Sequence, residues 1–321
     1  MTVAGALAPT PLERGVWGIL ATPFDGNGAV ELASLHEQIR LFSDAGARGV
    51  VALGVFGEAA RLDESERRTI ARAALSSARE HGLGAVVGIT TIDRDETIAQ
   101  ARSAVEVARE VAGDDAVAPG GLLRGLMVQV PTAEPVVLAD HMTTVHGVTG
   151  VGIVVQDYPR SSGIAIDAAV LAGAVAELPF VVAVKAESTP TAPAVATLVA
   201  GCGAPVFGGL GGVALIDELA AGASGAMTGF SFPEGLAATV AAFEQGGTEA
   251  AREVWARWMP LAVFEQQEGL ALTIRKEILR RRGILAHATV RRPAKPFPAL
   301  LETMLAGHLA DAERRLATDG H

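Results

Sequence analysis

The stretch GVVALGVFGEAARLDESERRTIARAALSSAREHGLGAVVGIT, residues 49–90, contains one strand–helix–strand unit and decides the fold class. Its apolar runs at Gly49–Val55 and Ala85–Thr90 have the length of buried strands, whereas Glu64–His81 has the spacing of an amphipathic helix. Asp63 is a suitable N-cap for this helix, and the glutamate three residues later completes a capping box. The two strands are therefore expected to lie parallel and to be joined by a right-handed crossover.

The same alternation of strand and helix continues on both sides of this unit. The predicted strands are Trp17–Phe24, Gly49–Val55, Ala85–Thr90, Leu126–Val130, Gly152–Gln156, Phe180–Lys185, Pro205–Gly209 and Gly225–Gly229. Eight such units favour an α/β fold of the (β/α)8 or TIM-barrel type. An open doubly wound sheet would usually have a glycine-rich turn after its first strand, and Thr22-Pro23-Phe24 is not one.

The strand pattern stops near residue 240, which divides the chain. We expect an N-terminal arm over residues 1–14, the barrel over residues 15–240 and a helical C-terminal extension over residues 241–321. The opening residues lack the basic and apolar segments of a signal peptide, so we expect a flexible arm and a cytoplasmic protein. The helices predicted in the extension are Glu249–Phe264, Gly269–Arg282 and Pro298–Ala317.

The composition excludes several classes of protein. The 321 residues are 50% apolar and 19% charged, with a mean hydropathy of +0.34, which excludes intrinsic disorder. Charged residues, glycine or proline interrupt every apolar run before it reaches the roughly 18 residues of a membrane span, so no membrane contact is expected. The formal net charge of −10 argues against a nucleic-acid partner, which requires a basic surface.

No metal site is expected. Cys202 is the only cysteine, so neither an internal disulfide nor a cysteine-based metal site can form. Asp140, His141 and His146 are close in sequence, but the two histidines do not have the spacing of one helical face. We therefore expect these three residues to lie on the surface.

Lys185 is the strongest candidate for chemistry. It is one of three lysines among 26 lysines and arginines, and it ends an apolar strand on which Val181 and Ala183 are expected to share its face. Desolvation inside a barrel favours the neutral amine, which attacks ketones and forms a Schiff base. The alternative is a structural ion pair with Glu187, two residues further along the same face, or with Asp157.

Two glycine-containing loops follow predicted strands, where barrel active sites lie. Backbone N–H groups in Gly54–Glu58 have the geometry to hold a carboxylate or phosphate. The run Gly208–Gly212 has the same potential, or leaves space for a substrate beside Lys185. For both loops the alternative is an ordinary tight turn.

Together these motifs resemble the dihydrodipicolinate synthase / N-acetylneuraminate lyase family of class I Schiff-base lyases. The resemblance runs from about Gly15 to the C-terminal helices. The motifs that carry it are GILATPF (18–24), GVFGEAARLDESER (54–67), VVQDYPRSSG (154–163), VVAVKAES (181–188), GGLGG (208–212) and GASGAMTGFSFPE (222–234).

The resemblance implies that Lys185 forms an imine with the ketone of a 2-oxo acid, such as pyruvate, so no separate cofactor is expected. It also implies that backbone amides near Val55 and Phe56 hold the substrate carboxylate, and that the protein is a homo-oligomer, a dimer or a tetramer. The substrate-binding residues expected on this basis are Val55, Phe56, Gly57, Glu58, Gln156, Asp157, Gly209, Gly229 and Ser231.

The chain departs from the family pattern at the residue that usually transfers protons. The family usually has a catalytic tyrosine after strand 4, where this chain has Thr132, and the only tyrosine is Tyr158 after strand 5. A threonine hydroxyl is a much weaker acid than a phenol. Besides Lys185, we therefore consider Thr132, Tyr158 and Glu187 as catalytic candidates, with Glu134 and Asp157 as further proton carriers.

Three functions are compatible with the sequence. The first is a Schiff-base lyase, an aldolase or dehydratase, acting on a 2-oxo acid; Gln156-Asp157-x-Pro159 and Gly225–Gly229 are most similar to 2-keto-3-deoxy-L-arabonate dehydratases. The second is dihydrodipicolinate synthase, which condenses pyruvate with aspartate semialdehyde. The third is a non-catalytic homologue that binds a 2-oxo acid, because the usual tyrosine is missing.

Overall fold

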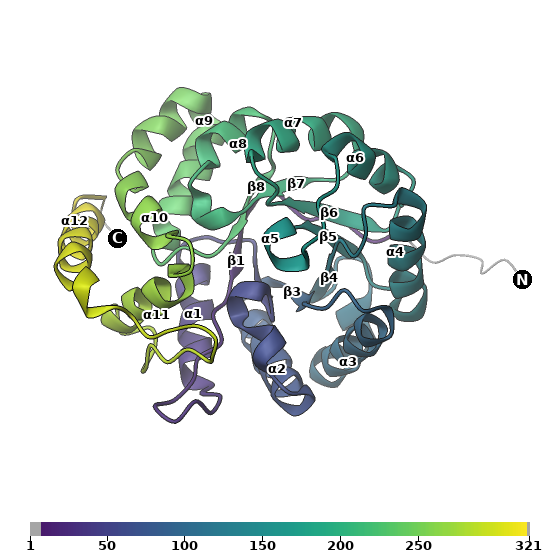
Figure 1. Ribbon diagram of the computed structural model, residues 1–321, viewed down its shortest axis with the longest axis horizontal. Helices are drawn as coiled ribbons and strands as arrows, with labels where there is room; N and C mark the ends of the chain where they lie inside the picture. Colours follow the sequence, from purple (N-terminus) through teal and green to yellow (C-terminus); the bar gives the residue numbers. More distant parts are fainter. Residues whose placement is uncertain (1–7, 320–321) are drawn as a thin grey trace, which may run out of the picture.

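The computed structural model describes residues 8–319 and contains a closed barrel of parallel strands, which confirms the predicted (β/α)8 fold. Each strand pairs with the next in sequence, and β8 pairs with β1 to close the barrel. Figure 1 shows the strands enclosed by a ring of helices. The strands are β1 (Gly15–Ile19), β2 (Gly49–Ala52), β3 (Gly84–Ile89), β4 (Leu123–Gln129), β5 (Ile153–Asp157), β6 (Val181–Ala186), β7 (Val206–Gly208) and β8 (Gly225–Thr228).

Helices follow the strands, as the alternating pattern predicts. In the second unit, the Asp63 carboxylate accepts from the Glu66 N–H at 2.8 Å and Glu66 accepts from the Asp63 N–H at 3.1 Å, which confirms the capping box. The helices are α1 (Ala33–Asp44), α2 (Glu64–Glu80), α3 (Arg94–Ala112), α4 (Pro135–Thr149), α5 (Pro159–Ser162), α6 (Ala168–Ala176), α7 (Thr191–Gly201), α8 (Leu215–Ala220), α9 (Pro233–Trp255), α10 (Met259–Glu265), α11 (Ala271–Arg281) and α12 (Glu302–Asp319). Short 3-10 turns include η1 (Val55–Gly57) and η4 (Leu210–Gly212).

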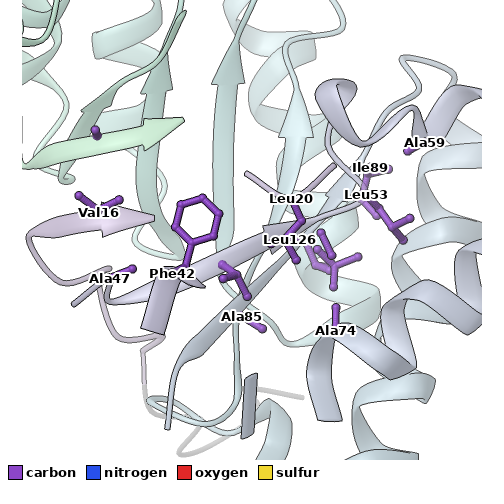
Figure 2. Close-up of a cluster of buried hydrophobic side chains, with 14 of the residues drawn as sticks. Val16, Leu20, Phe42, Ala47, Leu53, Ala59, Ala74, Ala85, Ile89 and Leu126 are labelled. Atoms are coloured by element: carbon purple, nitrogen blue, oxygen red, sulfur yellow. The ribbon is translucent and has the colours of Figure 1, made fainter. Parts of the chain in front are cut away.

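Apolar side chains fill two separate layers. One cluster lies inside the barrel and includes Trp17, Met127 and Phe207. A larger cluster lies between the strands and the helices, and Figure 2 shows Phe42 from α1 near Val16 and Ala85 of the barrel wall. Buried on both faces, the strands read as continuous apolar runs, which is why they were recognisable in the sequence.

The first strand is shorter than predicted. The apolar run Trp17–Phe24 predicts one long strand, but β1 ends at Ile19. Beyond it, the Thr22 hydroxyl donates to the Gly57 carbonyl at 2.5 Å, and Phe24 pairs with Val30 in an isolated antiparallel bridge. The buried loop after β1 is therefore as apolar as a strand, which explains the error.

The expected N-terminal arm is packed over the part that the structure describes. Residues 1–7 lie outside the described residues. Leu12 is buried in the interior cluster, and its N–H donates to the Val182 carbonyl at 3.0 Å. The prediction of a flexible arm is therefore wrong for residues 8–14, because Leu12 covers the amino-terminal end of the barrel interior.

The C-terminal extension is helical. The expected division at residues 240/241 falls inside α9, which has a non-helical residue at Gly247. The single helix predicted at Glu249–Phe264 is in fact the end of α9 followed by α10, and the chain changes direction between them. Figure 1 shows α10, α11 and α12 outside the ring of helices, on the side where α1 and α9 lie.

No helix among residues 8–319 is both long enough and apolar enough to span a membrane.

Candidate active site

Lys185 lies near the carboxyl end of β6, after a bulge. The register against β5 skips Val182, so Val182 and Ala183 both belong to the interior cluster while Val181 belongs to the outer one. The prediction that Ala183 shares the face of Lys185 agrees with this arrangement, and the same prediction for Val181 is wrong.

A cavity of about 300 Å³ opens at the carboxyl ends of the strands, where barrel enzymes place their chemistry. The Lys185 side chain lines this cavity and is only 6% exposed. The walls come from β1, β5, β6, β8, the loops after β2 and β7, and the segment from α10 to α11. The lining residues are Ile19, Gly54, Val55, Phe56, Gln156, Tyr158, Lys185, Glu187, Leu210, Gly211, Thr228, Gly229, Gln266, Gly269, Ala271, Leu272 and Arg275.

Lys185, Glu187 and Gln156 form a connected polar group in this cavity. Lys185 Nζ lies 2.9 Å from Glu187 Oε2, and Gln156 Nε2 donates to the same oxygen at 2.7 Å. Gln156 and Lys185 are partners in the register of β5 and β6, which brings their side chains to the same face. This arrangement places a carboxylate beside the amine, where it balances an ammonium charge or accepts a proton from it.

Asp157 is close to this group but on the opposite face of its strand. It is 1% exposed, and neither carboxylate oxygen has a hydrogen-bond partner in residues 8–319. Burial, with a smaller contribution from the charge of Glu187, raises the pKa of Asp157 to about 6. Asp157 does not line the cavity, so its effect on a substrate there would be indirect.

The candidate hydroxyl groups are placed very differently. Tyr158 lines the cavity, and burial, followed by the charge of Glu187, raises the pKa of its phenol. Thr132 does not line the cavity, and its hydroxyl accepts from the Glu134 N–H at 3.1 Å within the loop after β4. The exposed Glu134 is also outside the cavity lining. Of these three residues, the structure brings only Tyr158 to Lys185.

The loop after β2 divides into cavity and support residues. Val55 and Phe56 line the cavity and begin the turn η1, so no carbonyl within the turn can accept from their N–H groups. Gly57 and Glu58 lie behind them. Glu58 is 6% exposed and accepts from Lys276 Nζ at 2.5 Å.

Lys276, next to Arg275 in α11, is fully buried. Besides Glu58, its ammonium donates to the Thr289 carbonyl at 2.8 Å, and its Nζ lies 4.4 Å from the centroid of the Phe24 ring. The N–H of Arg291 donates to the other Glu58 oxygen at 2.8 Å. The C-terminal extension therefore holds the loop that contributes Val55 and Phe56.

The glycine and serine candidates on β7 and β8 also differ in role. Gly229 lines the cavity, whereas Gly209 lies against Glu187: a Cβ there would sit 2.5 Å from Glu187 Cγ. Ser231 is fully buried, and its N–H donates to Glu265 at 3.1 Å and its hydroxyl to the Arg275 carbonyl at 3.4 Å. Gly209 and Ser231 thus support side chains of the cavity without lining it.

Sequence reasoning missed the residues that the C-terminal extension contributes. Gln266, Leu272 and Arg275 all line the cavity, although they lie about 80 to 90 residues after Lys185. Arg275 has its guanidinium carbon 3.9 Å from the centroid of the Phe56 ring. The sequence signal was an arginine at a buried position of a predicted helix, which cannot be distinguished from a solvated one before the helix is placed.

An outer cavity of about 720 Å³ adjoins the first and shares Val55, Gly269 and Leu272 with it. Arginines 61, 160 and 291 and the loops after β3 and β5 contribute to its lining. Arg291 is held by Glu66 at 2.5 Å, and Arg160 lies 3.6 Å from Glu268. This outer cavity has the position of an entrance to the inner one.

Of the three residues of α4 expected on the surface, Asp140 is exposed, His146 is half-buried and His141 is buried, so the prediction is wrong for His141. His141 is 4% exposed, and its Nε2 has no partner among residues 8–319. His146 stacks on Phe180 with ring centroids 4.4 Å apart, and its Nδ1 lies 2.9 Å from the Val151 carbonyl. The apolar inner face of α4 explains both placements, since each histidine takes a packing position.

The fold and the lysine-containing cavity define a (β/α)8 barrel with the layout of an enzyme. Comparisons with known proteins specify the family. The model of the Dihydrodipicolinate synthetase family matches residues 13–304. The chain belongs to this family, whose members are lyases.

Individual relatives cover almost the whole chain. An L-2-keto-3-deoxyarabonate dehydratase from Azospirillum brasilense is 31% identical over 308 residues, which cover 95% of each chain. A 4-hydroxy-tetrahydrodipicolinate synthase from Kineococcus radiotolerans is 29% identical over 317 residues, covering 97% of this chain and 96% of that one. Among solved structures, a dihydrodipicolinate synthase from Rhodopseudomonas palustris matches with a TM-score of 0.83 at 25% identity, covering 95% of this chain and 99% of that one.

Proposed function

We propose that this protein is a Schiff-base lyase that removes water from a 2-keto-3-deoxy sugar acid through an imine on Lys185. The observation that carries the proposal is the buried Lys185, which faces a cavity at the carboxyl ends of the strands with Glu187 2.9 Å from its amine. The relative from Azospirillum brasilense, a dehydratase of such an acid, supports the choice of substrate class.

The reaction begins with the Lys185 amine. The Glu187 carboxylate accepts a proton from the ammonium, and the neutral amine attacks the C2 ketone of the 2-oxo acid. The resulting carbinolamine loses its hydroxyl group as water when Glu187 returns its proton to that hydroxyl, so that an iminium forms on Lys185 and Glu187 is again a carboxylate. The iminium then serves as the electron sink for the steps at C3 and C4.

Elimination follows from the same geometry. A base removes a proton from C3, the electron pair forms an enamine, and the enamine expels the C4 hydroxyl as water when an acid protonates it. Glu187 is the proposed base, and the Tyr158 phenol is the proposed acid, because both line the cavity with Lys185. Water finally hydrolyses the iminium, which releases the product and restores the amine.

Borohydride trapping tests this proposal. The protein is incubated with pyruvate, 2-keto-3-deoxy-L-arabonate or 2-keto-3-deoxygluconate, reduced, and examined by intact and peptide mass spectrometry. We expect a stable adduct on the peptide that contains Lys185, strongest with the compound that is also dehydrated. The Lys185→Met variant should give no adduct, whereas Lys295→Met, which removes a lysine outside the cavity, should react like the unchanged protein.

Synthase activity is the second candidate, favoured by the relative from Kineococcus radiotolerans. It predicts consumption of aspartate semialdehyde in the presence of pyruvate. Adduct formation with pyruvate but no turnover of this pair would exclude it. Binding of 2-oxo acids without an adduct or turnover for any of them would instead support the third function, a non-catalytic binding protein.

We also propose that the chain forms a homodimer or homotetramer and acts in the cytoplasm on a small-molecule substrate. Light scattering at micromolar concentration tests the assembly, and a monomeric mass would exclude it.

A further inference from the structure

We propose that Gln129 and Ser161 bind a hydroxyl group on the tail of the substrate and so select hydroxylated 2-oxo acids. The inference rests on the proposed function, because it takes Lys185 as the attachment point at C2 and the loop of Val55 and Phe56 as the site of the C1 carboxylate. It assigns a role to two neutral polar side chains, one on β4 and one in α5 after β5.

Gln129 belongs to the same inward-facing row of side chains as Lys185. The register pairs Gln129 of β4 with Gln156 of β5 and pairs Gln156 with Lys185 of β6. Met127, two residues before Gln129, belongs to the interior cluster, so Gln129 also points into the barrel. Because neighbouring strands lie about 4.8 Å apart, β4 is two such spacings from the strand of the reacting amine. Gln129 is thus placed for the tail of a ligand attached to Lys185, not for its ketone.

The outer cavity lies on the Gln129 side of the reacting amine. Lys185 and Gln156 line the inner cavity, whereas Gln129 lines the outer one, and Val55 of the carboxylate-binding loop lines both. A ligand fixed at C2 by Lys185 and at C1 by this loop therefore has the outer cavity within reach of its remaining carbons.

The two linings differ in the groups that they offer to a hydroxylated chain. On the side of β7 and β8, the inner cavity is bounded by Leu210, two glycines and Thr228, whose Oγ1 already accepts from the Gly211 N–H at 2.8 Å. The guanidinium carbon of Arg275 lies 3.9 Å from the centroid of the Phe56 ring, beside the carboxylate-binding loop. The outer cavity instead presents several neutral polar side chains, namely Thr90, Thr91, Gln129, Ser161 and Ser162. Partners for hydroxyl groups are therefore concentrated in the outer cavity.

Ser161 fixes the Gln129 amide and leaves one end of it open. Gln129 is 3% exposed, and its Nε2 donates to Ser161 Oγ at 2.9 Å. Among residues 8–319, Gln129 Oε1 accepts no hydrogen bond, yet it is not one of the buried polar atoms that are sealed from solvent without a partner. Since Gln129 lines the outer cavity, this accessible oxygen faces the cavity.

Together the two side chains match both functions of a hydroxyl group. Gln129 Oε1 accepts a hydrogen bond, and the Ser161 hydroxyl, which accepts from Gln129, retains its own proton for donation. A substrate hydroxyl between them donates to the first and accepts from the second. The opposite orientation of the amide would exchange donor and acceptor and leave the pair matched to a hydroxyl.

The charged residues of the outer cavity favour a neutral tail as well. Arg291 and Arg160 each lie beside a glutamate, at 2.5 and 3.6 Å, and Arg61 is exposed to solvent. Gln129 is the buried polar group of this lining that has an open hydrogen-bonding atom, and it carries no charge. A tail that bears hydroxyls and no second carboxylate fits this arrangement, in agreement with a 2-keto-3-deoxy sugar acid.

Two five-carbon acids that differ in one hydroxyl test the proposal. 2-Keto-3-deoxy-L-arabonate has hydroxyls on C4 and C5, whereas 4-hydroxy-2-oxopentanoate of the same C4 configuration lacks the one on C5. We expect the concentration for half-maximal borohydride trapping on Lys185 to be about tenfold lower for the sugar acid, because a site built to hydrogen-bond a hydroxyl discriminates against a ligand without it. Pyruvate, which has no tail, serves as the reference ligand.

The variant Gln129→Met keeps the length of the side chain but removes its amide. It should reduce the preference for the sugar acid to within about twofold and leave pyruvate trapping nearly unchanged. Ser161→Ala, at an exposed position where the fold is not at risk, should reduce the preference by about threefold. Comparing variants cancels the fraction of the sugar acid that is a closed ring in solution.

Gln100→Met is the matched control. The Gln100 amide also donates to a side-chain oxygen, that of Glu96 at 2.9 Å, but Gln100 lies in α3 and lines neither cavity. This variant should keep the full preference for the sugar acid.

Equal trapping of the two five-carbon acids by the unchanged protein would overturn the proposal. So would a Gln129→Met variant that weakens pyruvate as much as the sugar acid, because Gln129 would then serve the inner cavity or the fold. Calorimetric binding of both acids separates this proposal from the proposed function. Preferential binding of the sugar acid that is lost in Gln129→Met, without any adduct on Lys185, would retain the hydroxyl subsite and reject the Schiff-base function.

Discussion

Lys185 Nζ lies 2.9 Å from Glu187 Oε2, and both side chains are less than a tenth exposed. A buried lysine with a single carboxylate partner is held in place by that carboxylate. The cavity beside the pair gives the Lys185 amine room to react with a substrate. The Lys185–Glu187 ion pair does not argue against catalysis. The same Glu187 is positioned to take the proton that the Lys185 amine must lose before it can attack a ketone.

Replacing this carboxylate should abolish most of the turnover. The Glu187→Gln variant keeps the size of the side chain but has no basic oxygen, so we expect turnover of the best-trapped 2-oxo acid to fall about a hundredfold or more. Steady-state assays with the same substrate measure the loss. Glu234→Gln is the control, since it removes another ion-paired carboxylate outside the cavity, and a comparable loss in that variant would contradict a specific role for Glu187.

Replacing Tyr158 should lower the activity much more than replacing Thr132. Tyr158 lines the cavity and its raised pKa keeps the phenol protonated, ready to donate to a leaving hydroxyl. We expect Tyr158→Phe to lower turnover by about tenfold or more and Thr132→Val to change it by less than about threefold. Rate measurements on the two variants decide the question, and a larger loss for Thr132→Val would show that the loop after β4 reaches the substrate.

The fold could be predicted from the sequence because each strand is buried on both faces. Continuous apolar runs such as Gly49–Val55 have the length of a buried strand rather than that of a helix, and Asp63 marks a helix start by local chemistry alone. The same property caused the error at Trp17–Phe24, where a buried loop is as apolar as a strand. The burial of Leu12 was not predicted, because a single apolar residue among polar neighbours forms no periodic hydrophobic pattern.

Only the part of the site that the barrel contributes could be predicted from the sequence. Lys185 and Glu187 follow from alternation along one strand, but the contribution of the extension does not. Arg275 and Lys276 are adjacent in α11, yet Arg275 lines the cavity whereas Lys276 pairs with Glu58. No local pattern distinguishes them, since the difference depends on where α11 packs against the barrel.

Glu218 should make stability depend on pH. This residue of α8 is 1% exposed, its carboxylate has no well-formed hydrogen bond in residues 8–319, and only the Thr191 hydroxyl is near enough to oppose its burial. Burial raises the pKa of Glu218 to about 7 from 4.5. The folded state therefore binds the proton more tightly, so its stability is highest below pH 4.5 and falls as the pH rises to about 7.

The Glu218→Gln variant removes this dependence. Each pH unit between the two pKa values contributes about 1.4 kcal/mol. The free energy of unfolding of the variant, relative to that of the unchanged protein, should therefore rise by on the order of 3 kcal/mol between pH 4.5 and pH 8. Denaturant unfolding at several pH values measures the difference, in which the contribution of Asp157 cancels. Glu177→Gln, at the exposed end of α6, should show a flat difference, and a flat difference for Glu218→Gln would reject the prediction.

The pair formed by Lys276 and Glu58 should link the stability of the extension to substrate binding. Lys276→Met leaves Glu58 buried with only the Arg291 N–H as a partner, and breaking a buried pair in this way costs about 3–5 kcal/mol. Glu58 directly follows the turn that presents Val55 and Phe56 to the cavity, so the variant should also raise KM more than it lowers kcat.

A double variant makes this last prediction specific. Lys276→Met combined with Glu58→Gln removes the unpaired charge, and we expect it to recover about half or more of the lost unfolding free energy. KM should recover less, because the neutral pair no longer holds the turn after β2 as firmly. Denaturant unfolding and steady-state kinetics on the two variants provide both numbers. If stability fell in the single variant while KM stayed constant, the extension would stabilise the barrel without positioning the carboxylate-binding loop.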